Sequence, residues 1–88
     1  MRFDLDIINE KGLHARASAK FVETVESFDA EALVSKDGME VGGDSIMGLM
    51  MLAASKGCQI GVETSGNQSQ ELAEALTALV GDFFGEGK

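Results

Sequence analysis

The sequence has few of the residues that form covalent or metal cross-links. It contains one cysteine, Cys58, and one histidine, His14, among 88 residues. A single cysteine excludes an internal disulfide, and the usual zinc sites need more cysteine and histidine ligands than the chain has. We therefore expect no metal, no cofactor and a fold stabilised by packing. A chain of this length forms one small core, so residues 1–88 are expected to make a single domain.

Basic residues and long apolar runs are also scarce. The 7 Lys and Arg residues face 15 Asp and Glu residues, and the resulting net charge of −8 disfavours binding to nucleic acid or anionic lipid. The chain has neither an apolar run of membrane-spanning length nor a signal-peptide pattern. These absences predict a cytoplasmic protein without nucleic-acid or membrane partners. They favour a carrier or binding module over an enzyme, because so short a chain can rarely spare the interior for an enclosed pocket.

Hydrophobic periodicity predicts a strand, a helix and a hairpin in the first half of the chain. Phe3, Leu5 and Ile7 alternate with polar residues, as in a strand with one buried face. A helix is predicted over residues 15–27, where the apolar residues fall on one stripe. This stripe consists of Ala17, Phe21, Val22, Val25 and Phe28. Two short alternating runs on either side of residues 36–38 predict the hairpin.

The second half predicts a short helix, a fourth strand and a long final helix. Asp44 or Ser45 is suited to cap the short helix, which should end near Gly57. Alternation resumes over residues 58–62, and residues 67–70 resemble a capping box ahead of the apolar stripe that ends at residue 83. Residues 85–88 are expected to fray, because they have nothing apolar to bury.

The predicted order is strand, helix, strand, strand, helix, strand, helix. Strands that alternate cleanly between polar and apolar residues have one face in water, which favours an antiparallel arrangement. The amphipathic helices then cover the other face. We therefore predict the α+β class: an open-faced two-layer sandwich in which three helices cover one face of a four-stranded, mostly antiparallel sheet.

The charge around His14 differs from that of the whole chain. Between Glu10 and Glu23 there is no acidic residue but three basic ones, a local balance of +3 in a chain of −8. His14 precedes the first predicted helix, where about four backbone N–H groups lack partners and the helix dipole is positive. Phosphate is the natural ligand of such a position. Imidazole can serve as a nucleophile there, and Arg16 can pair with phosphoryl oxygens.

A structural interpretation of the same residues is also open. A lone histidine at a helix start is commonly a surface or capping residue, and basic clusters at helix starts also arise by chance. The residue pattern alone does not decide between these two interpretations.

Two segments resemble the HPr family of bacterial phosphocarriers. Residues 11–22, KGLHARASAKFV, are similar to the active-site segment of that family. Residues 44–52, DSIMGLMML, are similar to its serine region and second helix. Residues 28–31 and 54–60 look closer to the nitrogen-related branch, NPr, although the sugar-type branch stays open. The resemblance spans almost the whole chain and implies an HPr-like fold.

The resemblance implies a phosphoryl relay within the phosphotransferase system. Enzyme I, charged from phosphoenolpyruvate, would phosphorylate Nδ1 of His14, and His14 would pass the group to a IIA-type acceptor. Arg16 and the backbone at Ala15 and Ala17 would bind the phosphate. Ala17 stands where the family commonly has proline, so the helix start keeps one more N–H donor. The protein would be a monomeric substrate and donor for phosphotransferases and not itself an enzyme.

Two rival functions remain at this stage. One is a regulatory binding module with the same fold that does not relay phosphate. The other is an unrelated small α+β enzyme, which would act without partner proteins and would need a second essential general base.

The resemblance also implies a regulatory site and a docking surface around the second helix. Ser45 is expected to cap that helix, and in many relatives the matching serine is phosphorylated by HPr kinase/phosphorylase. Spacing places Ile46, Leu49, Met50 and Ala53 on a core stripe. Because the helix is apolar all round, one face is expected to stay exposed and to dock enzyme I and the acceptor. The docking residues are predicted to be Lys20, Ile46, Met47, Met50 and Met51.

Overall fold

The strands of the computed structural model, which describes residues 1–88, form one antiparallel sheet. They lie in the order β1-β4-β2-β3, and each neighbouring pair is antiparallel. The strands are β1 (Arg2–Asp6), β2 (Glu31–Lys36), β3 (Met39–Gly42) and β4 (Gln59–Ser65). The helices are α1 (Ala15–Glu26), α2 (Ile46–Met51), α3 (Ser69–Gly81) and a short 3₁₀ helix, η1 (Phe83–Gly85).

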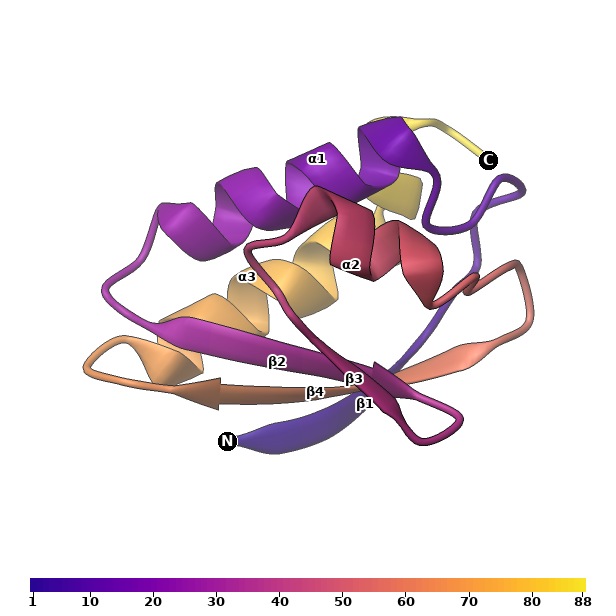
Figure 1. Cartoon of the computed structure of the whole chain (residues 1–88). Coiled ribbons are helices and arrows are strands. Elements are labelled where there is room, and N and C mark those ends of the chain that lie inside the picture. Colours follow the sequence, from indigo (N-terminus) through magenta and orange to yellow (C-terminus); the bar gives the residue numbers. More distant parts are fainter.

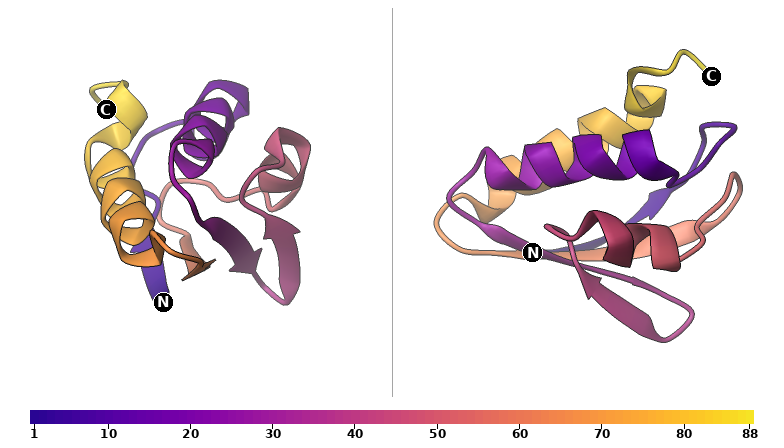
Figure 2. Two further views of the ribbon diagram at one scale, coloured as in Figure 1. Left: turned by 90° about the vertical axis from the view of Figure 1, so that its left-hand side faces the viewer. Right: turned by 45° about the horizontal axis from the view of Figure 1, so that its top comes forward.

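The three α-helices lie on one side of the sheet, and the other side is open (Figures 1 and 2). The predicted βαββαβα order and the two-layer α+β class are therefore confirmed. No helix is both long and apolar enough to cross a membrane. In Figure 1 the C-terminus lies near the start of α1, so the last residues of the chain are close to the loop that carries His14.

The core fills the space between the sheet and the helices. The alternation predicted for β1 and β4 is confirmed, because Leu5, Ile60 and Val62 are buried beneath the helices. Most of the predicted stripe of α1 is buried as well, and Phe21 is completely so. Phe28 lies beyond the end of α1 and is half-buried.

The expectations for α2 were partly wrong. The helix ends at Met51 and not near Gly57, because Ala53 has a φ of 53°, a left-handed conformation that an α-helix cannot contain. The expected core stripe was also wrong. Of its four residues only Leu49 is buried, while Ile46, Met50 and Ala53 are exposed.

The two predicted helix caps had different outcomes. Ser45 is the N-cap of α2, and its hydroxyl accepts a hydrogen bond from the Gly48 N–H at 3.0 Å. The expected capping box before α3 was wrong, because Gln68 is the N-cap and makes no side-chain capping bond.

The C-terminal segment does not fray, contrary to the expectation. Phe83 and Phe84 have φ values of 56° and 53°, so the chain turns back after α3 and buries the Phe84 ring completely. The Lys20 ammonium donates to the Phe84 carbonyl at 2.6 Å. The Lys88 carbonyl accepts from the Glu10 N–H at 3.3 Å. The expectation failed because Phe84 supplies the apolar anchor that residues 85–88 lack.

We predict that Phe84→Ala lowers the free energy of unfolding by about 3–5 kcal/mol, because it leaves a cavity under the C-terminal turn. Urea denaturation followed by circular dichroism measures this change. Phe83→Ala is the matched control and should cost clearly less, since Phe83 is half-exposed. Equal losses for the two variants would show that Phe84 is not the anchor.

We also predict that Ser45→Ala lowers the free energy of unfolding by about 1 kcal/mol, because the Gly48 N–H loses its acceptor. Ser45→Asp restores a capping oxygen and should retain nearly all of the wild-type stability. The cap explanation fails if the alanine and aspartate variants are equally destabilised in the same denaturation experiment.

Candidate functional site

His14 is the N-cap of α1 and has extended backbone geometry, with φ −77° and ψ −176°. The first backbone bond of the helix runs from the Ser18 N–H to the His14 carbonyl at 2.9 Å. The three preceding amides, those of Ala15, Arg16 and Ala17, donate to no backbone carbonyl. The His14 side chain does not cap them either. The amides of Ala15 and Arg16 belong to exposed residues and therefore remain for an external anion, with the positive end of the helix dipole behind them, whereas Ala17 is completely buried.

The loop before His14 is held against the segment that follows α2. The Leu13 N–H donates to the Ala54 carbonyl at 2.9 Å. Gly12 has a φ of 65°, and a Cβ at this position would lie 2.3 Å from the same carbonyl oxygen. Glycine is therefore required for the close approach of the two segments. This packing fixes the backbone position from which the His14 side chain extends.

The His14 ring lies at the surface beside a shallow hollow. The side chain is 28% exposed, and the hollow has a volume of about 280 Å³. The ring shares its lining with residues of the loop before it, of α2 and of the segment after α2: Lys11, Leu13, Met50, Ala53, Ala54 and Ser55. Arg16 is exposed and takes part in no ion pair. Its guanidinium is thus available to an anion bound at the helix start.

Glu86 contacts His14, and the sequence analysis did not identify this residue. Its Oε2 atom is in hydrogen-bond contact with Nε2 of the ring, and its Oε1 atom accepts from the Asn9 amide nitrogen at 3.0 Å. The same nitrogen donates to the Gly12 carbonyl at 2.9 Å, and Asn9 is completely buried. Glu86, Asn9 and the loop of His14 therefore form one hydrogen-bonded unit.

Two opposing effects act on the pKa of Glu86. Desolvation by burial acts to raise this pKa. The hydrogen bonds from Asn9 and His14 and the charges of His14 and Lys11 outweigh it, and the pKa falls below its ordinary value. The carboxylate is therefore ionised at neutral pH and can only accept hydrogen bonds. The local surplus of positive charge predicted around His14 is reduced by this acid, which comes from the other end of the chain.

The remaining predicted site residues lie on α1 and α2. Lys20 is half-buried, and its ammonium is bonded to the C-terminal turn. Ser45 is half-buried at the start of α2. The predicted docking residues of α2 are all exposed: Ile46 by 40%, Met47 by 75%, Met50 by 44% and Met51 by 65%. Because Met50 also lines the hollow at His14, this apolar patch continues to the edge of the imidazole site.

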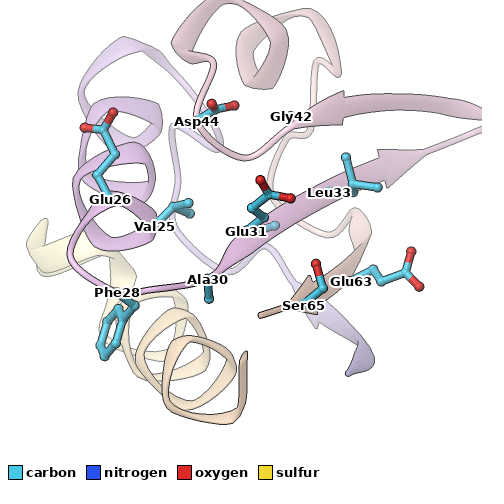
Figure 3. Close-up of a pocket in the computed structure, with 11 residues that line it drawn as sticks. Val25, Glu26, Phe28, Ala30, Glu31, Leu33, Gly42, Asp44, Glu63 and Ser65 are labelled. Carbon is cyan, nitrogen blue, oxygen red and sulfur yellow. The ribbon is translucent and has the colours of Figure 1, made fainter. Parts of the chain in front are cut away.

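A larger hollow of about 610 Å³ lies elsewhere, between the C-terminal end of α1 and the sheet (Figure 3). Carboxylates from four different segments surround it, those of Glu26, Glu31, Asp44 and Glu63. It contains neither His14 nor Arg16. His14, the candidate nucleophile, therefore lies at the small surface hollow and not at the larger one.

Comparison with known proteins agrees with this geometry. A family model described as the HPr component phosphorylation site of the phosphotransferase system matches residues 1–82. Phosphocarrier protein HPr of Neisseria meningitidis is 50% identical over 88 residues, which is 100% of this chain and 99% of that protein. Phosphocarrier protein NPr of Escherichia coli is 41% identical over 83 residues, which is 93% and 92% of the two chains.

The fold agrees as well. The crystal structure of HPr from Thermoanaerobacter tengcongensis matches with a TM-score of 0.92 at 37% identity and covers 98% of this chain and 97% of that one. A histidine at a helix start with free amides, an exposed arginine two residues later and the matched phosphorylation-site model all indicate the same assignment. The chain belongs to the HPr family of phosphocarriers of the phosphotransferase system.

Proposed function

We propose that this protein relays a phosphoryl group on His14. Enzyme I, charged from phosphoenolpyruvate, supplies the group, and a IIA-type protein accepts it. The observation that carries the proposal is the position of the ring at the N-terminus of α1, beside three backbone amides without intrahelical partners and the unpaired guanidinium of Arg16. A nucleophile and a binding site for the transferred group meet there.

An exposed site suits a relay with two partners. The same ring must face the donor and then the acceptor, so a deep pocket would exclude both proteins. His14 lies at a shallow hollow instead. A bond between phosphorus and an imidazole nitrogen breaks readily, so transfer onto and off the ring can be nearly balanced. We expect the protein to act as a monomer in the cytoplasm and as a substrate and donor, not as a catalyst.

Backbone amides and Arg16 bind the phosphoryl oxygens in this proposal. The N–H groups of Ala15 and Ala17 both belong to the free first turn of α1, where Ala15 is exposed and Ala17 is completely buried. Proline at position 17 would remove one of these donors. The alanine therefore keeps a first-turn donor that proline would lack.

The apolar patch of α2 serves as the docking surface for both partners. It consists of Ile46, Met47, Met50 and Met51. Methionine side chains adapt to differently shaped surfaces, which suits two successive partners. Lys20 of α1 also contributes to docking in this proposal, since its bond to Phe84 uses only one of the three ammonium donors.

Ser45 is a regulatory phosphorylation site in this proposal, with HPr kinase/phosphorylase as the enzyme. Its hydroxyl caps α2, directly before the apolar patch. Phosphorylation would add about two negative charges there and weaken the apolar docking of enzyme I. Capping and regulation are compatible, because phosphoryl oxygens can also accept from free amides at a helix start.

The relay is tested by incubating the protein with purified enzyme I and labelled phosphoenolpyruvate. We predict an acid-labile label and a mass increase of one phosphoryl group on the wild type, with neither on His14→Ala. Ser45→Ala is the matched control and should be labelled like the wild type. A wild-type chain that stays unlabelled, while another HPr is labelled in the same mixture, would contradict the relay and support a purely regulatory binding module.

The docking surface is tested by Met47→Glu. We predict that KM for enzyme I-dependent phosphorylation rises roughly tenfold with little change in kcat, because the variant weakens binding but leaves the reacting groups intact. The control is Leu33→Glu, which places the same charge on a 42% exposed apolar residue of β2. Similar KM values for the two variants would exclude α2 as the docking surface.

A further inference from the structure

The Glu86 carboxylate contacts one specific nitrogen of the His14 ring. The contact involves Nε2, and an ionised carboxylate only accepts hydrogen bonds, so Nε2 must donate. A neutral imidazole carries a single N–H, and the other nitrogen keeps its lone pair. The contact therefore leaves Nδ1 as the ring atom that can attack phosphorus.

The position of this carboxylate is fixed by several independent contacts. The completely buried Asn9 holds Oε1, and the Gly12 carbonyl in turn holds the Asn9 amide. Both partners of the Asn9 nitrogen are acceptors, so the amide cannot turn over without bringing oxygen against oxygen. The buried Phe84 and its bond from Lys20 anchor the segment that carries Glu86. The C-terminal segment is therefore held firmly enough to orient the Glu86 side chain, as a helix or strand would.

We propose that Glu86 is a positioning residue for phosphoryl transfer, which holds the His14 ring as the Nε2–H tautomer and stabilises the charge that the ring acquires on phosphorylation. The inference rests on the proposed carrier function. Pairing of a reactive imidazole with a carboxylate on its second nitrogen is a general device for setting the tautomer and orientation of the ring.

The transfer step balances without any proton leaving the ring. The Nδ1 lone pair forms the bond to phosphorus while the bond between phosphorus and the donor breaks and its electron pair leaves with the donor. The ring, which still carries the Nε2 proton, gains a positive charge, and Glu86 lies against that proton. In transfer to the acceptor, the electron pair returns to Nδ1 and neutral imidazole is released. The carboxylate thus stabilises the positive charge that the ring carries in the transition state, which is shared by transfer onto the ring and off it.

Glu86→Gln tests this role, because the amide has no charge and can either accept from the ring or donate to it. The first measurement is the ¹⁵N NMR spectrum of the ring in the isolated protein, at a pH where the ring is neutral. We predict mainly the Nε2–H tautomer in the wild type and a larger share of Nδ1–H in the variant. The second is the single-turnover rate of phosphorylation by enzyme I, which should fall roughly tenfold.

Two further chains serve as controls. Asp82→Asn removes a carboxylate from the same end of the chain and is expected to match the wild type, because Asp82 is exposed and makes no ion pair. A chain that ends at Gly85 keeps the Phe84 anchor and should behave like Glu86→Gln. Circular dichroism of each variant verifies that the fold is retained.

Unchanged tautomer and rate in folded Glu86→Gln would overturn the role of Glu86, even if the wild type is phosphorylated normally. Failure of the wild type to accept phosphate would instead refute the carrier function. The tautomer measurement uses the protein alone, so it still decides whether Glu86 orients the ring.

Discussion

The direction of α1 is the constraint on which the site depends. Ala17, Phe21 and Val25 bury one face of this helix against the sheet, so the helix cannot turn about its axis without exposing apolar surface to water. Its free N-terminal amides are therefore held at one edge of the molecule. His14 is the N-cap and is held there with them. The same packing thus forms the core of the protein and sets the position of the His14 ring.

The charges at the site have separate tasks. The first-turn amides and Arg16 are the proposed ligands of the phosphoryl group, whereas Glu86 contacts the ring. An overall charge of −8 does not prevent anion binding, because helix-end amides act within the first turn. The apolar side chains of α2 begin directly beside the ring, since Met50 lines the same hollow as His14. The proposed phosphate site and the proposed docking surface are therefore adjacent on the molecule.

Local patterns in the sequence predicted most of the fold. Alternation located the strands, and the apolar stripe of α1 and the Ser45 cap are both present. Two of the failures concern contacts between distant residues. The turn at Phe84 depends on a cavity that the completed core provides, and Glu86 lies 72 residues from His14 in the chain. A short apolar helix such as α2 also has no polar face in its sequence, so periodicity could not tell which side of it would be exposed.

The central claim is that Nδ1 of His14 carries the phosphoryl group. The most direct measurement is heteronuclear NMR of the protein labelled with ¹⁵N in histidine and phosphorylated by enzyme I, in which the nitrogen bonded to phosphorus shows a ³¹P coupling. The account predicts this coupling at Nδ1, with the proton retained on Nε2. A coupling at Nε2, or a phosphorylated chain in which neither ring nitrogen couples to phosphorus, would contradict it.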